Sequence, residues 1–433
     1  MTIEEILKAT DGILLNKTKN KIIDHFEVDT RKIKPQDGFI ALKTDYRNGH
    51  DFIKEAIKKK ASVLIVSEDI QSKTHIPVIK VKNTHECLFD LANFMKRKYP
   101  IFSIAITGSN GKTTTKELLY EVLSQKYNVL KNQGNYNNHI GVPLTCLNLN
   151  ESYDILLTEM GMNHSGEISK LSKLIKPDVG IITNIGTSHI GNLGSLQKIK
   201  CAKLEILDGM EESILFVNGK NKYLKKIHDD RVIKIPSNDI KIEKIEGNLE
   251  ETNINFSYNQ KKYSIHFYGP KYFVSNIFLV LEIGLLLDIP IEEIIKTIEN
   301  YQMYEHRMNV IKGDNTLIDD TYNASFESLS SALEILRHEK KDKIIILGDM
   351  LELGKYSKKY HKKINKLLKK IKKKKVFLIG EYTKYIHGIH FSSNQELINY
   401  LKKINIKDHI IFIKGSRKMK LEQVVEYSKN YFV

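Results

Sequence analysis

A glycine-rich turn between a strand-like run and a helix is the segment best suited to chemistry. The run AITGSNGKTTTKELLYEVL spans residues 105–123, and its apolar residues after the turn recur at helical spacing. Gly108 and Gly111 allow the backbone to approach phosphate oxygens, and helix N-terminal N–H groups attract the anion. Lys112 would reach the terminal phosphates, and the Thr113 hydroxyl would contact magnesium. The pattern is a variant phosphate loop, since Ile106 replaces the usual first glycine; the alternative is a chance Gly-Lys turn.

A carboxylate ends the next apolar run, YDILLTEM. In a parallel sheet, ligands bind beyond the carboxyl ends of the strands, which is where Glu159 would lie. A carboxylate at that edge can hold the magnesium ion that bridges ATP phosphates. The alternative is an ordinary charged residue at a strand end, and the segment alone leaves both open.

A histidine and a lysine follow in TNIGTSHIGNLGSLQKIKCAKLEIL. His189 lies in a polar turn after the strand GIITNI, and a helix is expected from about Ser195. One face of that helix would carry Leu196, Ile199, Lys203, Ile206 and Met210. A lysine within an apolar stripe is unusual. It either extends its ammonium to solvent from a half-buried face or points inward to serve the phosphate site.

The elements that position these residues form three regions. Residues 1–82 indicate a small α/β unit, 83–310 a mainly parallel doubly wound sheet, and 311–433 a smaller alternation of strands and helices. We therefore expect an α/β protein of three domains: a small N-terminal domain, a central domain like the P-loop ATPases, and a C-terminal Rossmann-like domain.

Composition limits the class of protein. The chain has 433 residues, 41% hydrophobic and 28% charged, and no apolar run reaches the length of a membrane span. Its 3 cysteines are scattered, which favours reduced thiols in the cytoplasm. The net charge of +16 fits either a lysine-rich composition or an anionic partner. The run from Lys369 to Lys375 lacks interleaved aromatic residues, so we favour a solvated helix end over a nucleic-acid patch.

Four segments occur in the order and spacing of the Mur ligase family: TGSNGKTT, TEMGMNHSGEI, TNIGTSHIGNLGS and AKLEIL. The chain resembles this family over essentially its whole length. DTRKIKPQDGFIAL followed by GHDFI is similar to the family's UDP-binding segment. IDDTYNASFESLSSAL, ILGDMLELG and IKGSRKMKLEQVV resemble the branch that adds D-alanyl-D-alanine, and Gly-Met-Asn-His at 161–164 is among its most specific runs. The Asp-Asn-Pro-Arg motif of the ligase that adds the third stem residue is absent.

The resemblance implies a role for each matching residue. ATP would be bound by Thr107, Gly108, Ser109, Asn110, Gly111, Lys112, Thr113, Arg307 and Asp320. Catalysis would depend on Lys112, His189 and Lys203, with one magnesium ion on Thr113 and Glu159 and a second held by His189 and by Lys203 as a carbamate. The substrates would be contacted by Asp29, Thr30, Arg31, Asn135, Asn137, Asn138, Tyr322 and Asn323, the first three at the UDP group. Lys414, Ser416 and Arg417 would help bind the dipeptide.

The implied reaction joins UDP-N-acetylmuramoyl-tripeptide to D-alanyl-D-alanine through an acyl phosphate, at the expense of ATP, in the synthesis of the peptidoglycan precursor. The implied protein is a cytoplasmic monomer without a membrane segment or a nucleic-acid partner. Two positions depart from the family's runs. Ser325 and Phe326 replace an Asn-Pro pair, and Thr44 stands where glycine is common. These departures concern the adenine-side loop and the UDP loop.

Other functions remain open at this stage. A different Mur-family or folylpolyglutamate-type ligase would keep the phosphate loop and change the acceptor. A basic P-loop ATPase that depends on nucleic acid would leave His189 and Lys203 unexplained. A non-catalytic protein on the same scaffold is expected to lose Lys112, Glu159 or Lys203, and all are present.

Overall fold

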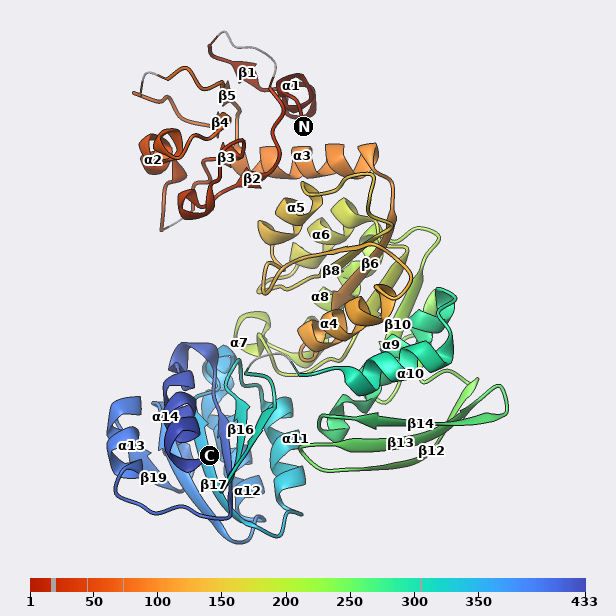
Figure 1. The fold of residues 1–433 in the computed structure, drawn as a ribbon, viewed down its shortest axis with the longest axis vertical. Coiled ribbons are helices and arrows are strands. Elements are labelled where there is room, and N and C mark those ends of the chain that lie inside the picture. Colours follow the sequence, from red (N-terminus) through yellow and green to blue (C-terminus); the bar gives the residue numbers. More distant parts are fainter. Residues whose placement is uncertain (17–20, 45, 73, 304–305) are drawn as a thin grey trace.

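A computed structural model describes residues 1–16, 21–44, 46–72, 74–303 and 306–433. The chain forms an elongated α/β assembly, with the N-terminal unit at one end and the C-terminal unit at the other (Figure 1). The predicted fold class is confirmed, since the two six-stranded sheets are mainly parallel. Within the described ranges, no helix has both the length and the apolar character needed to cross a bilayer.

The N-terminal unit is a sheet of order β1-β5-β4-β3-β2, parallel except for β1. Its strands are β1 (Ile13–Leu14), β2 (Phe26–Glu27), β3 (Gly38–Ile40), β4 (Val63–Val66) and β5 (Val78–Lys80). Its helices are α1 (Ile3–Thr10), η1 (Thr30–Lys32), η2 (Gly49–Phe52) and α2 (Ile53–Lys58). The long helix α3 (Thr84–Lys98) leads to the central sheet and ends shortly before Pro100.

The central sheet is parallel throughout, in the order β11-β10-β9-β6-β8-β7. The strands are β6 (Phe102–Thr107), β7 (Val129–Lys131), β8 (Ile155–Glu159), β9 (Val179–Ile182), β10 (Ile214–Asn218) and β11 (Val232–Ile235). The helices are α4 (Lys112–Leu123), α5 (Gly141–Cys146), α6 (Glu167–Ile175), α7 (Ile190–Leu193), α8 (Leu196–Leu204) and η3 (Glu205–Gly209). Strands β8 and β9 are buried along their whole length, as expected for a parallel sheet with both faces covered.

An antiparallel sheet follows, which the alternation of strands and helices did not predict. It consists of β12 (Ile240–Gly247), β13 (Thr252–Tyr258) and β14 (Lys261–Phe267), and it precedes η4 (Lys271–Phe273), α9 (Val274–Leu286) and α10 (Ile291–Asn300). Ile254 and Phe256 of β13 are buried in one core with the apolar helix α9. The sheet therefore extends the central unit sideways (Figure 1).

The C-terminal sheet has the order β15-β16-β20-β17-β18-β19, with β15 antiparallel at one edge. Its strands are β15 (Asn309–Lys312), β16 (Thr316–Asp320), β17 (Asp342–Gly348), β18 (Lys374–Ile379), β19 (Ile389–Phe391) and β20 (His409–Lys414). Its helices are α11 (Phe326–Leu336), η5 (Leu351–Tyr356), α12 (Ser357–Leu368), η6 (Tyr382–Tyr385), α13 (Asn394–Leu401), η7 (Arg417–Met419) and α14 (Glu422–Phe432). The lysine-rich run begins directly after α12 and is largely exposed, as predicted.

Candidate active site

The central and C-terminal units enclose a cavity of about 480 Å³ at the carboxyl edge of the central sheet. The structure brings most of the predicted site residues to its wall: Ser109, Asn110, Gly111, Lys112, Thr113, Asn135, Asn137, Asn138, Glu159, His189, Arg307, Asp320, Tyr322 and Asn323. Lys414 also lines it, whereas Thr107, Gly108 and Lys203 lie behind the wall. Residues on separate strand ends and on two units thus converge on one space.

The turn after β6 requires glycine at two positions. Gly108 has φ +150°, and a Cβ atom there would lie 1.9 Å from the Thr183 hydroxyl oxygen. Gly111 has φ +79°, and its Cβ would lie 2.7 Å from Nδ2 of Asn276. Both the backbone conformation and the close neighbours exclude larger residues.

The phosphate loop differs from expectation at two N–H groups. Those of Ser109 and Asn110 donate to the backbone oxygen and the side-chain oxygen of Asn184, at 3.0 and 2.9 Å. They hold the loop against the strand end of β9 rather than facing an anion. The first turn of α4, whose N–H groups lack partners within the helix, remains beside the cavity.

Lys112 begins helix α4 and its ammonium folds back onto the loop. Its Nζ donates to the Gly108 carbonyl at 2.9 Å. Burial lowers the pKa of Lys112, and the nearby Glu159 and Glu352 oppose that shift. The cation is therefore already placed within the phosphate-binding turn.

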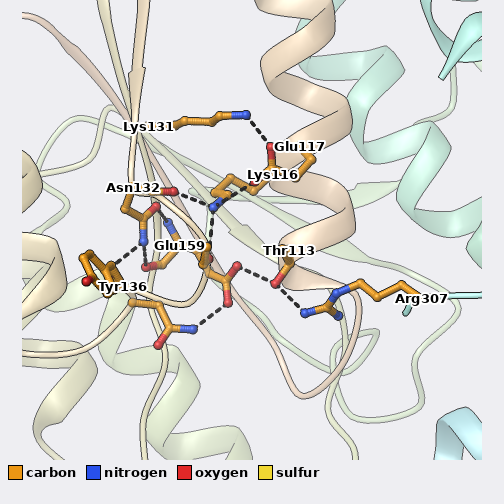
Figure 2. A network of polar contacts seen from close by, with 10 residues as sticks. Thr113, Lys116, Glu117, Lys131, Asn132, Tyr136, Glu159 and Arg307 are labelled. Carbon is orange, nitrogen blue, oxygen red and sulfur yellow. Dashed lines mark hydrogen bonds and ion pairs between the residues drawn. The ribbon is translucent and has the colours of Figure 1, made fainter. Parts of the chain in front are cut away.

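Glu159 ends β8 and is held on all sides by polar contacts (Figure 2). The Thr113 hydroxyl donates to its Oε2 at 2.8 Å, and Asn137 Nδ2 donates to its Oε1 at 2.7 Å. Asn132 binds both the N–H and the carbonyl of Glu159 through its side-chain amide. With only 2% of its surface exposed, the carboxylate has one orientation, directed at the phosphate loop.

Lys116 ties the nucleotide-binding helix to this arrangement, a role that the sequence analysis missed. Its side chain is fully buried, and its Nζ donates to the Asn132 carbonyl at 2.6 Å (Figure 2). The ammonium also lies 3.1 Å from Glu117 Oε1, and Glu117 pairs with Lys131. The register between α4 and the loop after β7 thus depends on a buried cation.

Lys116→Met is expected to lower the free energy of unfolding by about 3 kcal/mol. The substitution leaves the buried Asn132 carbonyl and the Glu117 carboxylate without the ammonium group that they contact. Chemical denaturation measures the loss. The matched control is Lys362→Met, which removes an exposed lysine from α12. Equal unfolding midpoints for the two variants would contradict the structural role of Lys116.

His189 and Lys203 lie close enough to Lys112 of the phosphate loop to feel its charge. His189 caps α7 with φ +62°, and its Nδ1 is 3.7 Å from Glu352 Oε2 of the C-terminal unit. Burial lowers the pKa of His189 to about 4, so the imidazole is neutral and able to bind a metal.

Lys203 is 1% exposed, so the inward orientation replaces the solvent-reaching alternative. The expected helix ends at Leu204, and its apolar face continues through the turn η3. Burial, reinforced by Lys112, lowers the pKa of Lys203 well below its usual value. Among the described residues, none forms a hydrogen bond or an ion pair with its ammonium.

Arg307 connects the C-terminal side to the phosphate loop. Its Nη2 donates to the Thr113 hydroxyl at 3.0 Å, and its guanidinium stacks 3.7 Å from the centroid of the Tyr322 ring. Asp320 at the end of β16 pairs with Lys414, which also donates to the Asn323 carbonyl at 3.0 Å. Burial raises the pKa of Asp320, and the Lys414 ammonium opposes that shift.

Two further contacts join the units. Ser325 caps α11 and donates from its hydroxyl to Asn110 Oδ1 at 2.8 Å. Glu327 Oε2 accepts from the N–H and the hydroxyl of Thr187, at 2.9 and 2.7 Å. The departure at Ser325 therefore gives the C-terminal unit a direct contact with the phosphate loop, and Phe326 packs on Tyr360.

The predicted UDP residues lie in the N-terminal unit, outside the cavity. Asp29 caps η1 and pairs with Arg31 at 2.6 Å, which lowers the pKa of the carboxyl to about 2. Thr30 is buried and donates to Glu55, so its hydroxyl is already occupied. Arg31 is exposed and offers its guanidinium to solvent. Thr44, the departure in the neighbouring loop, exchanges hydrogen bonds with Arg47.

A phosphate loop and a buried carboxylate follow adjacent strands at one edge of a parallel sheet, and a second α/β unit closes over them. This arrangement defines a nucleotide-dependent enzyme of two catalytic units. Residues 106–284 match the Mur ligase middle domain and residues 306–417 the Mur ligase, glutamate ligase domain. UDP-N-acetylmuramoyl-tripeptide--D-alanyl-D-alanine ligase of Bacillus subtilis is 32% identical, over 98% of this chain and 97% of its own.

Two solved structures of Mur ligases are similar to this chain over nearly its whole length. A crystal structure of MurF from Acinetobacter baumannii has a TM-score of 0.90 at 27% identity and covers 99% of this chain and 98% of its own. MurF ligase from Thermotoga maritima, in complex with ADP, has a TM-score of 0.85 at 25% identity, over 94% and 98%. The chain belongs to the Mur ligase family.

Proposed function

We propose that the chain joins D-alanyl-D-alanine to UDP-N-acetylmuramoyl-tripeptide in an ATP-dependent reaction, as a step of peptidoglycan precursor synthesis. The observation that carries this function is the placement of Lys112, Glu159 and His189 on one cavity between two units. The full-length similarity to ligases of that specificity supports it.

We propose magnesium as the cofactor, and the residues present fit it. Thr113 and Glu159 lie in contact, and a hydroxyl beside a carboxylate matches the preference of Mg²⁺ for oxygen ligands. No group of three or more His, Cys, Asp or Glu residues in the described ranges could hold a metal by itself. ATP phosphates would therefore complete the first site. His189 and a carbamate on Lys203 would hold a second ion, and the metals would offset phosphate charge.

The reaction begins when the tripeptide carboxylate attacks the γ-phosphate of ATP, forming an acyl phosphate and releasing ADP. Both reactants are anionic, so Lys112 and Arg307 offset their repulsion and orient the phosphoryl group. The acceptor then loses the extra proton of its ammonium group to solvent, and the neutral amine attacks the acyl carbon. Loss of phosphate and of one N–H proton from the tetrahedral intermediate leaves the amide. Contact of Ser325 and Glu327 with the central unit would exclude water, which would otherwise hydrolyse the acyl phosphate.

We assign residues 1–82 to the UDP substrate, 83–310 to ATP and 311–433 to closure and dipeptide binding. Strand β15 lies across the second of these boundaries. Cys87, Cys146 and Cys201 are free thiols, which suits a reducing compartment, and we place the enzyme in the cytoplasm as a monomer.

Arg31→Ala is expected to weaken binding of the UDP substrate about tenfold or more, since one charged hydrogen bond to phosphate is lost. The affinity for ATP should stay near its wild-type value because Arg31 does not line the ATP cavity. Calorimetric titration of each ligand measures both affinities. Equal losses for the two ligands would count against a separate UDP site.

Phosphate release with ATP and UDP-N-acetylmuramoyl-tripeptide, with and without D-alanyl-D-alanine, tests the function. We expect rapid release only with the dipeptide, and a pentapeptide product by mass spectrometry. Single amino acids and glutamate serve as competing acceptors. Preferred use of one of these would overturn the proposed specificity.

A further inference from the structure

Glu352 is a carboxylate of the C-terminal unit that lines the cavity, and one of its oxygens has no donor among the described residues. Glu352 lies in η5, and its Oε1 accepts from Asn323 Nδ2 at 3.2 Å. Within the described part of the chain, no N–H or O–H group donates to its Oε2, and the imidazole Nδ1 of His189 lies 3.7 Å from that oxygen. The side chain is 32% exposed and lines the cavity wall.

The other carboxylates of the cavity differ in how they are held, and among the described residues Asp320 and Glu327 also receive donors on only one oxygen each. Glu159 is bound by Thr113 and Asn137, Asp320 by Lys414, and Glu167 by Asn163 and His164. Glu327 is held through one oxygen by Thr187. Glu352 and Glu159 raise the pKa of Lys112 and Lys203, whereas Glu327 is not among the groups that do so. Glu352 is therefore the carboxylate of the C-terminal unit that combines a donor-free oxygen with a charge acting on Lys112 and Lys203.

We propose that Glu352 binds the ammonium group of the incoming acceptor. The inference rests on the proposed function, in which the acceptor enters with an α-amino group whose pKa is about 8. Lys112 and Arg307 would repel such a cation, because both lie on the same cavity. A carboxylate with one oxygen already fixed by Asn323 offsets the repulsion and orients the nitrogen. Because η5 belongs to the C-terminal unit, the acceptor is bound where the two units meet.

Glu352→Gln tests the assignment, since it removes the charge and keeps the shape and an oxygen acceptor for Asn323. The KM for D-alanyl-D-alanine is expected to rise about ten- to a hundredfold, the range for a lost hydrogen bond to a charged group. The KM values for ATP and for the UDP substrate should remain near those of the wild type. ADP formation in a single turnover without acceptor should also persist, because that step precedes amine binding.

A matched variant distinguishes binding of the acceptor from closure of the C-terminal unit onto the central unit. Glu327→Gln makes the same exchange in the same unit and weakens the contact with Thr187, so it should raise the KM values for all substrates together. If Glu352→Gln does the same, Glu352 is a closure contact and the proposal is overturned. An unchanged KM for the dipeptide in Glu352→Gln would also overturn it.

An acceptor analogue adds an independent readout. Propionyl-D-alanine lacks only the amino group of the dipeptide, so its inhibition constant should be the same in wild type and Glu352→Gln. An inhibition constant that rises as much as the dipeptide KM would assign Glu352 to another part of the ligand and overturn the proposal. A wild-type enzyme that forms no amide with D-alanyl-D-alanine would instead refute the proposed function, before Glu352 is tested.

Discussion

Lys112→Ala should reduce ligation by about a thousandfold or more, the scale expected when a preorganised charge that stabilises a transition state is removed. The Nζ of Lys112 already lies within the phosphate loop, 2.9 Å from the Gly108 carbonyl, so little reorganisation is needed when ATP binds. Single-turnover ADP formation isolates the phosphoryl step from product release. Turnover near the wild-type value would remove the assignment of this loop to ATP phosphates.

A control must show that Lys112→Ala still folds. Lys112→Ala loses one hydrogen bond at the start of α4, but Gly108 and Gly111 keep the turn in its conformation. We therefore expect a thermal unfolding midpoint close to that of the wild type. The exposed Lys362→Ala variant should keep both activity and stability.

Lys203→Ala should be nearly inactive, and short carboxylates such as acetate should restore part of the activity. Burial lowers the pKa of Lys203, so more of the side chain is a neutral amine. A neutral amine can add carbon dioxide to form a carbamate, which would replace a positive charge by a negative one where the proposed second magnesium ion would bind. Activity of the wild type should then depend on bicarbonate, and carbon-13 labelled bicarbonate should give a carbamate signal in the NMR spectrum.

The arginine variant distinguishes the two roles of this lysine. A plain cation at position 203 predicts that Lys203→Arg works well and that carboxylates do nothing. The carbamate predicts an inactive Lys203→Arg. Substantial activity in that variant, together with a wild type indifferent to bicarbonate, would refute the carbamate hypothesis.

The parts of the site that sequence reasoning predicted best are those made by consecutive residues. The glycines, Lys112 and Thr113 lie in one turn, so their spacing already specifies a strand, a loop and a helix. The antiparallel sheet was missed although β13 alternates buried and exposed residues, because such alternation does not show which core a strand joins. Ser109 and Asn110 were expected to face phosphate, and only the folded loop shows that Asn184 occupies their N–H groups.

Glu352 shows why the rest could not be predicted. The run that contains it, ILGDMLELG, resembles one branch of the family, but its neighbour His189 belongs to another unit, far away in the chain. Lys116 was hidden for a different reason: a lysine in the first turns of a helix is usually exposed, and only the packing of the loop after β7 buries it. Local residue types therefore indicate the chemistry of a site, whereas contacts between residues of different units can be identified only from the tertiary structure.

The hydroxyl of Ser325 has two acceptors within reach, one in each unit. Which acceptor it uses can change when the two units separate to release product. It lies 2.8 Å from Asn110 Oδ1 across the interface and 3.1 Å from the Ser328 hydroxyl within its own helix. If the units separate, a rotation about the Cβ–Oγ bond of Ser325 redirects its hydroxyl hydrogen toward Ser328 Oγ, and the helix cap persists because Ser325 still accepts from the Ser328 N–H. Neither arrangement then leaves the Ser325 hydroxyl without an acceptor, so separation of the units does not cost this donor its hydrogen bond.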